Sequence, residues 1–212
     1  MDPRLDLVTG SVELRRGRLV YVHPRDAMAL LDEDGVAEAH PPYWAEPWPS
    51  GIELARAVSA QDWSGARVLE LGCGLGLPAV AAAVHGARVL ATDRSPDALV
   101  FAAVNAEQNG VAVDTAVYAW AEPAFLLGRA PWRLVLGADV LYGQRNVDEL
   151  LDLLPRLVDG EGEVWIADPG RPLTPAFLAA AAARWSSVTS TSTRVADVRI
   201  HRLAGLRAGT RA

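Results

Sequence analysis

The fold is decided by residues 68–93, VLELGCGLGLPAVAAAVHGARVLATD. The apolar run ARVLEL at 66–71 predicts a buried strand. A glycine-rich turn follows it, and the alanine- and valine-rich segment after the turn predicts a helix that ends near His85. The run ARVLATD at 87–93 predicts a second buried strand. A strand, a turn, a helix and a second strand form one unit of a parallel sheet.

The same alternation continues toward the C-terminus. The last two predicted strands, at 186–195 and 196–203, have no helix between them, so their pairing is expected to be antiparallel. The sequence therefore predicts an α/β fold with a Rossmann-like, doubly wound, seven-stranded sheet that is mostly parallel with an antiparallel last strand. Such a sheet binds its ligand beyond the carboxyl ends of the strands. The other predicted strands are 113–120, 132–139 and 162–168, and the other predicted helices are 95–110, 146–159 and 174–185.

The N-terminal part has a different character. Residues 11–15 and 18–22 flank Arg16-Gly17 and predict a small hairpin, and residues 25–34 are compatible with a short helix. The segment PPYWAEPWPSG, residues 41–51, is rich in proline and aromatic residues and predicts an ordered loop. Ser50 is expected to cap the following helix. We expect a single domain, in which 1–50 form a hairpin and a lid and 51–212 form the cofactor-binding core.

Two acids lie at the ends of the first two strands of the sheet. Glu70 precedes the first glycine of the turn, where a dinucleotide site would bring a pyrophosphate to the helix N-terminus. An acid there favours a ligand with an ammonium group, although Glu70 also fits a polar strand end. Asp93 suits the two hydroxyls of a ribose, or a charge at the helix N-terminus beside Ser95. Together the two acids suit a nucleoside joined to an amino acid, namely S-adenosylmethionine.

Two further strand ends supply candidate site residues. Trp120 ends the third predicted strand, where it either flanks an adenine or belongs to the core. The fourth predicted strand runs into Asp139 and Tyr142. These two side chains are expected at the pocket floor, where the transferred methyl group would lie.

The sequence resembles the class I, seven-strand S-adenosylmethionine-dependent methyltransferases over residues 41–203, on the first two motifs within 68–93. Three segments resemble a narrower group within that superfamily, the protein-lysine methyltransferases. The segment Asp139-Val140-Leu141-Tyr142 resembles their D-x-x-Y motif. The other two are YWAEPWPSGIELAR before the first strand and ADPGR at 167–171, the latter similar to the electron-transfer-flavoprotein β-subunit lysine methyltransferases.

This resemblance implies a role for each candidate residue. The turn from Gly72 to Gly76 is expected to wrap the methionine part of the cofactor, Asp93 to hold the ribose and Trp120 to contact the adenine. Trp48 is expected to cover the cofactor from the N-terminal side, although Trp44 and Trp48 also fit a hydrophobic plug. The implied cofactor-binding residues are Trp48, Glu70, Gly72, Cys73, Gly74, Gly76, Asp93, Arg94, Trp120 and Asp139.

The implied catalytic residues are Asp139 and Tyr142, which would line the acceptor channel and align the amine. Asp168 and Arg171 are expected either at the substrate rim or as a local turn pair. S-adenosylhomocysteine would be the product. No metal is expected, because the histidines and the single cysteine show no ligand spacing.

Composition limits the setting. The net charge of −6 argues against nucleic acid as a partner. All 20 basic residues are arginine, which is typical of a GC-rich bacterial gene. There is no apolar run long enough for a membrane span and no signal peptide, so a cytoplasmic location is expected. A monomer is expected as the default for one small domain of this kind.

Three functions remain open at this point. The first is methylation of a lysine side chain in a protein. The second is methylation of a small molecule such as an amine, a pyridine or a secondary metabolite, which would share every cofactor motif. The third is a cofactor-binding module without catalysis that acts through partner contact. A nicotinamide enzyme is disfavoured because Glu70 precedes the glycines.

Overall fold

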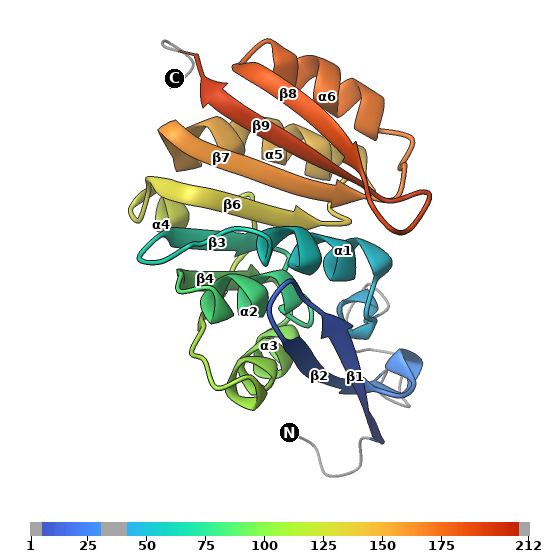
Figure 1. Cartoon of the computed structure of the whole chain (residues 1–212). Helices are drawn as coiled ribbons and strands as arrows, with labels where there is room; N and C mark the ends of the chain where they lie inside the picture. Colours follow the sequence, from blue (N-terminus) through green and yellow to red (C-terminus); the bar gives the residue numbers. More distant parts are fainter. Residues whose placement is uncertain (1–5, 31–41, 208–212) are drawn as a thin grey trace.

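A seven-stranded sheet runs through the middle of the protein (Figure 1). The computed structural model describes residues 6–30 and 42–207. The strands of this sheet are β3 (Arg67–Leu71), β4 (Arg88–Asp93), β5 (Asp114–Val117), β6 (Trp132–Ala138), β7 (Val158–Asp168), β8 (Trp185–Ser192) and β9 (Arg199–Leu206). They lie in the order β5-β4-β3-β6-β7-β9-β8.

The strand directions place the ligand-binding edge. Strands β3 to β7 pair in parallel, whereas β9 pairs antiparallel with both β7 and β8. The chain winds from β3 outward to β5, and then returns to the other side of β3 to form β6. The winding direction therefore reverses between β3 and β6, and ligands of doubly wound sheets bind beside such a reversal. The predicted fold class is confirmed, with the last strand inserted between its two predecessors.

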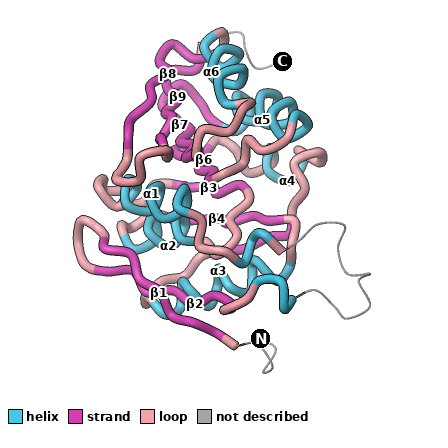
Figure 2. Tube along the Cα trace, turned by 90° about the vertical axis from the view of Figure 1, so that its right-hand side faces the viewer, coloured by secondary structure: helices cyan, strands magenta, loops and turns pink. Residues whose placement is uncertain are grey.

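Helices cover both faces of the sheet (Figure 2). One buried cluster joins one face of the sheet to α1, α2 and α3 through residues such as Leu54, Val80 and Phe101. A second cluster joins the other face to α4, α5 and α6 through Leu126, Leu150 and Phe177. The helices are α1 (Pro49–Val58), α2 (Leu77–Val84), α3 (Pro96–Gln108), α4 (Ala124–Leu127), α5 (Gln144–Leu157) and α6 (Thr174–Ala182), with short 3-10 turns at Ala27–Leu30 and Tyr43–Ala45.

A separate hairpin of β1 (Leu7–Glu13) and β2 (Arg18–Pro24) lies against α3. Two asparagine side chains of α3 bind the main chain of β2. The amide of Asn105 accepts from Val22 N–H at 2.8 Å and donates to Val22 O at 3.3 Å. Asn109 binds Val20 in the same two-way manner, at 3.0 and 2.7 Å. The predicted hairpin is confirmed. Its second strand, β2, forms hydrogen bonds with β1 along one edge and with the two asparagine side chains of α3 along the other.

The structure corrects two details near the lid. Helix α1 begins at Pro49, because proline is favoured at a first helical position, so Ser50 lies buried inside the first turn and is not the cap. The short helix predicted over 25–34 is a 3-10 turn at Ala27–Leu30, and residues 31–34 lie outside the described residues.

Two further elements differ from the prediction. The third predicted strand ends at Val117, so Trp120 lies in the turn after β5 rather than at its end. Helix α4 follows this turn and was not predicted, because its four residues are too few to show a helical period. Helix α5 contains Pro155 near its C-terminal end, as the sequence implied.

Among residues 6–30 and 42–207, none of the helices has the length and apolar character of a membrane span. The same part of the chain holds no group of three potential metal ligands.

Candidate active site

The loops that follow β3, β4, β6 and β7 all lie at the carboxyl edge of the sheet, which faces the viewer in Figure 2. The loop after β3 is tied directly to the end of β4. The N–H of Cys73 donates to Thr92 O at 2.9 Å, and the N–H of Gly74 donates to Asp93 Oδ2 at 2.9 Å. The first two motifs of the sequence therefore form one structural unit.

The glycines of this turn are required by backbone conformation and by close packing. Gly72, Gly74 and Gly76 have φ of 66°, 50° and 73°, a region that favours glycine. A Cβ at Gly74 would lie 2.9 Å from the carbonyl oxygen of Trp44. A Cβ at Gly76 would lie 2.8 Å from Cβ of Ala102 in α3. The turn is thus pressed between α3 and the segment that leads into α1.

Glu70 is buried beneath the turn. Its Oε2 accepts a hydrogen bond from the N–H of Ala79 in the first turn of α2 at 2.8 Å. Its Oε1 is also buried and has no hydrogen-bond partner within the described residues. Burial raises the pKa of Glu70 well above its usual value, the nearby charge of Asp93 adds to the rise, and the Ala79 N–H opposes it. One oxygen of the buried Glu70 carboxyl is therefore available to accept a hydrogen bond.

Asp93 ends β4 and is almost fully buried. Its two oxygens accept from the N–H groups of Gly74 and Ser95, at 2.9 and 3.0 Å. Burial raises its pKa, although these two donors work against the rise. Each oxygen keeps lone-pair capacity for a further donor such as a ribose hydroxyl. The neighbouring Arg94 is exposed and favours the charged form of Asp93.

Cys73 is buried inside the turn. Burial raises the pKa of its thiol well above the usual value, and the charges of Asp93 and Glu70 raise it further. The residue is therefore a protonated thiol at neutral pH, which fits a packing role in the turn.

Three tryptophans flank the site in different ways. The Trp120 ring borders Gly72, since a Cβ at that glycine would lie 3.5 Å from Cζ2 of the indole. Trp44 packs its ring on Phe101 of α3, with centroids 5.5 Å apart, and its main chain borders Gly74. Trp48 is 40% exposed. Its indole N–H donates to Tyr43 O at 2.7 Å. The part of the tryptophan-rich segment in contact with the turn is therefore Trp44.

Asp139 follows β6 and forms a paired contact with Arg171. Arg171 Nε donates to Oδ1 at 2.8 Å and Nη2 donates to Oδ2 at 3.0 Å. The carboxylate side chain of Asp139 is only 9% exposed. Its backbone has φ of 56°, unusual for a residue with a side chain, and its N–H donates to Ala167 O of β7 at 2.8 Å. The hydrogen bonds to Asp139 raise the pKa of Arg171.

The loop that carries Arg171 is shaped by Asp168. The Oδ1 of Asp168 accepts from the N–H groups of Gly170 and Arg171 at 2.8 Å each, and from the Thr174 hydroxyl at 2.6 Å. Asp168 is fully buried, so it forms a turn and does not reach a substrate rim. Arg171 instead leaves the turn to meet Asp139, a pairing that neither of the two alternatives from sequence described.

Tyr142 differs from its expected place. Its side chain is 61% exposed, so it lies at the surface beyond β6 and not at a pocket floor. The residue before it, Leu141, is fully buried and occupies the core position in this segment.

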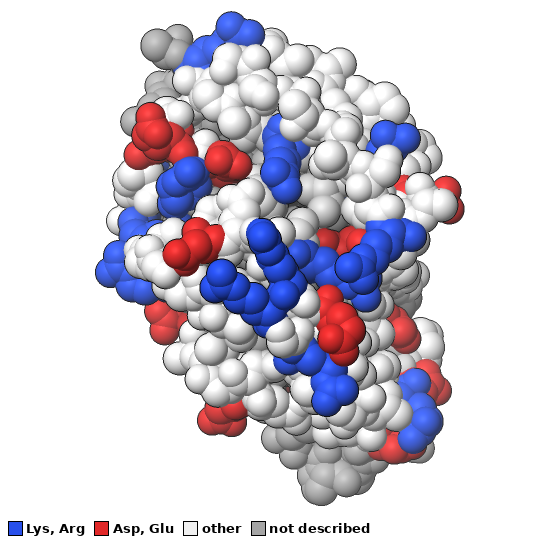
Figure 3. All heavy atoms as spheres, viewed as in Figure 1, with Lys and Arg blue, Asp and Glu red and all other residues white. Residues whose placement is uncertain are grey.

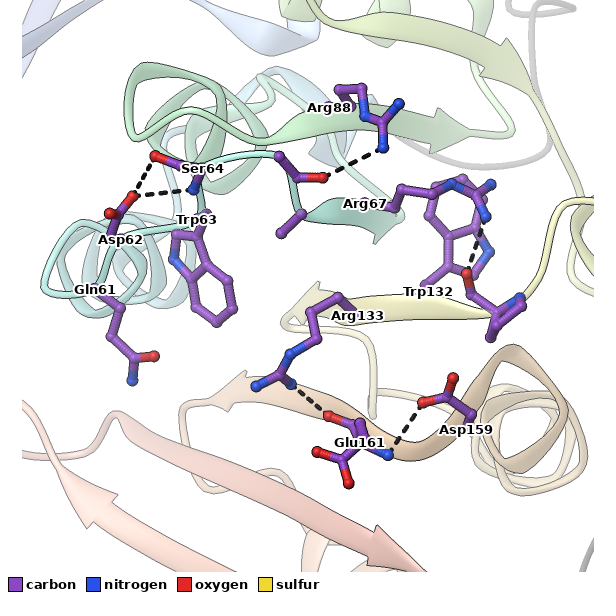
Figure 4. Close-up of a pocket in the computed structure, with 13 residues that line it drawn as sticks. Gln61, Asp62, Trp63, Ser64, Arg67, Arg88, Trp132, Arg133, Asp159 and Glu161 are labelled. Atoms are coloured by element: carbon purple, nitrogen blue, oxygen red, sulfur yellow. Dashed lines mark hydrogen bonds between the residues drawn. The ribbon is translucent and has the colours of Figure 1, made fainter.

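A different hollow, of about 620 Å³, lies at the amino ends of the strands (Figure 4). Arg67, Arg88 and Arg133 line it, and each donates to a main-chain carbonyl at its wall. The carboxylates of Asp62, Asp159 and Glu161 also line it. This hollow is separate from the candidate site, because it lies at the amino ends of the strands and the site residues follow their carboxyl ends.

Charge is unevenly spread on the face drawn in Figure 3, where arginines gather across the middle and acids are scattered. Helix α1 lies toward the right of the same view (Figure 1). Arg56 of α1 pairs with Glu53, which also accepts from the backbone N–H of Arg194 at 3.3 Å. Arg15 of the hairpin turn donates to Ala60 O just beyond α1 at 2.8 Å.

Comparison with known proteins places the chain in a family. A family profile described as "Lysine methyltransferase" matches residues 44–174, more than half of the chain. The chain belongs to the lysine methyltransferase family. The matched segment of this family member contains every candidate residue named above, from Trp48 to Arg171.

Curated relatives of this lysine methyltransferase family member include two from vertebrates. The electron transfer flavoprotein beta subunit lysine methyltransferase of Xenopus laevis is 40% identical over 137 residues, which are 61% of this chain and 53% of the relative. Protein N-lysine methyltransferase METTL21A of Danio rerio is 37% identical over 127 residues, 57% of this chain and 58% of the relative. The chain thus spans about half the length of the curated relatives it matches.

Solved structures share the fold. A Thermus thermophilus 16S rRNA N2 G1207 methyltransferase, in complex with AdoMet and guanosine, aligns with a TM-score of 0.67 at 15% identity. The alignment covers 95% of this chain and 51% of that chain.

Proposed function

We propose that the protein is an S-adenosylmethionine-dependent methyltransferase that methylates a lysine side chain of a protein. The observation that carries the proposal is the pair of buried carboxyls, Glu70 and Asp93, at the ends of adjacent strands beneath a glycine turn. Membership of the lysine methyltransferase family supports it. The names of the relatives, which include a flavoprotein-subunit and a protein N-lysine methyltransferase, favour a protein as the acceptor.

The residues of the turn fit this cofactor. S-adenosylmethionine carries a sulfonium and an ammonium, and the edge that would receive it holds the buried carboxyls of Glu70 and Asp93. The unpartnered Oε1 of Glu70 is an acceptor suited to a cationic donor. The free lone pairs of Asp93 suit ribose hydroxyls, and Trp120 beside Gly72 suits a flat purine.

The other proposed cofactor contacts come from the turn and its borders. Gly72, Cys73, Gly74 and Gly76 would surround the methionine part, because the three glycines have no side chain to keep a ligand away from the main chain. Arg94 would lie at the outer side of the ribose. Trp48 would close the site from the lid.

When bound, S-adenosylmethionine supplies an activated methyl group, so the protein contributes mainly position and a dry pocket. The lysine acceptor has to be neutral, although its ordinary pKa is about 10.4. Burial and nearby positive charge both favour the neutral amine. Asp139 would accept a hydrogen bond from this amine and align it, and the exposed Tyr142 would border the entrance. S-adenosylhomocysteine would leave as product.

We infer the setting from composition. The chain would act as a single-domain monomer in the cytoplasm of a bacterium, with the lid in 1–50 and the core in 51–212. The arginine-only basic set supports the bacterial origin. The net charge of −6 supports a protein rather than a nucleic acid as partner.

The test is transfer of a labelled methyl group from S-adenosylmethionine into a bacterial lysate. The lysate is then split into protein and small-molecule fractions, and the label in each is measured. We expect label at lysine in one protein band with wild type, and loss of most of it with Asp139→Asn while cofactor affinity is kept. Label in the small-molecule fraction alone would replace the protein acceptor by a small amine. No label in either fraction, with the cofactor bound, would favour a non-catalytic module.

A further inference from the structure

We propose that Arg171 is a positioning residue for methyl transfer, which fixes the orientation of the Asp139 carboxylate toward the acceptor amine. The inference rests on the proposed function, and it assigns to Arg171 a role that acts through Asp139 and not through contact with the substrate.

The contact geometry supports a positioning role. A guanidinium that donates from Nε and Nη2 to the two oxygens of one carboxylate fixes both the distance and the plane of that carboxylate. The contact joins residues 32 positions apart, so it links the loop after β6 to the loop after β7. Each carboxylate oxygen still has acceptor capacity away from Arg171.

The backbone on both sides of the contact is unusually constrained. Asp139 has φ of 56° and is held through its N–H to Ala167 O, so its side chain leaves the strand end in a direction that ordinary strand geometry does not give. On the other side, the buried Asp168 binds the N–H of Arg171 itself. The arginine therefore starts from a fixed point, and little freedom remains in the pair.

The chemistry of the pair defines what Asp139 can do. Arginine remains protonated in proteins, so Asp139 faces a permanent cation. A carboxylate held in this way is suited to accept a hydrogen bond from the amine and to hold its nitrogen in line. Without Arg171 the carboxylate would rotate, and misplacement of about 1 Å is enough to reduce a rate by about 100-fold.

The test compares Arg171→Gln, Arg171→Lys, Asp139→Asn and the double variant Arg171→Gln/Asp139→Asn. The control is Arg145→Gln, which removes another guanidinium paired to a carboxylate, Glu149, but on the exposed surface of α5. We expect Arg171→Gln to lower kcat by about 10- to 100-fold with little change in melting temperature or in the dissociation constant for S-adenosylmethionine. Arg171→Lys should recover part of kcat, and Arg145→Gln should match wild type.

The double variant gives the decisive readout. If Arg171 acts through Asp139, the second substitution should cost nothing beyond Asp139→Asn alone. Additive losses would overturn the inference, because they would mean that Arg171 contacts the substrate independently. An active wild type whose Arg171→Gln variant keeps its kcat would overturn this inference alone. A wild type that methylates neither fraction would overturn the proposed function, and this inference with it.

Discussion

At the scale of single residues, Gly74 brings the turn after β3 against Trp44, in the segment that leads into α1. Gly74 and Gly110 both have positive φ, of 50° and 69°, so alanine at either is strained by about 1–2 kcal/mol. A Cβ at Gly74 would also meet Trp44 O at 2.9 Å, whereas at Gly110 no atom of the described residues lies within 4 Å. We therefore expect Gly74→Ala to lose more stability than Gly110→Ala, and to lose cofactor affinity as well. Urea unfolding and calorimetric titration with S-adenosylmethionine measure both quantities. Equal losses of stability and of affinity in the two variants would show that the contact between Gly74 and Trp44 contributes to neither.

Site residues that belong to one short sequence motif could be predicted, whereas contacts between distant loops could not. Glu70 and Asp93 could be predicted as candidates because each ends a strand within one recognisable motif. Arg171 was noted in sequence, but its pairing with Asp139 could not be predicted, since it depends on how two loops leave neighbouring strands. The exposure of Tyr142 could not be predicted for a similar reason, because the sequence places Tyr142 after a strand but does not give the path of the chain beyond it. The binding roles of these residues remain predictions.

At the scale of elements, strands buried on both faces were the most predictable. The runs that became β3, β4 and β6 are apolar and short, and the structure confirms them. Strand β5 lies at the sheet edge and is half exposed, so its apolar pattern is weak and its end was predicted three residues too late. The start of α1 was misplaced because Ser50 and Pro49 both signal a helix N-terminus, and the proline position prevailed.

The docking of the hairpin depends on Asn105. This fully buried side chain serves Val22 N–H and Val22 O, and also donates to Leu75 O in the turn at 3.0 Å. Asn105→Ala would leave the buried Val22 N–H without a partner, at a cost of about 1–3 kcal/mol. We expect lower unfolding free energy and faster amide exchange in β1 and β2. Glu107→Ala, on the exposed side of the same helix, is the control and should change neither. Unchanged exchange in Asn105→Ala would show that Asn109 and the apolar contacts hold the hairpin without Asn105.

At the scale of the whole molecule, Glu70 makes stability depend on pH. Burial raises the pKa of folded Glu70 well above the usual 4.5, so the folded state binds this proton more tightly than the unfolded state. Unfolding free energy then falls as the pH rises above the unfolded pKa. Glu70→Gln removes this titration. The unfolding free energy of the variant, relative to wild type, should therefore rise with pH from 4.5 toward neutrality, whatever constant the buried amide adds.

Urea unfolding without cofactor, repeated across this pH range, measures the difference. Glu107→Gln, which removes an exposed carboxylate, serves as the matched control. A flat difference for Glu70→Gln would contradict a raised pKa in the folded state.

The buried Cys73 offers a way to time the opening of this molecule. As the single cysteine of the sequence, it reports from one place without any added label. A thiol reagent in native buffer reaches the sulfur only when the turn around it opens, so the modification rate counts those openings. A ligand that binds only the closed turn lowers the modification rate by a factor set by the ligand concentration and its affinity. The rate of Cys73 modification, followed by absorbance, therefore measures ligand binding and requires no acceptor for the methyl group.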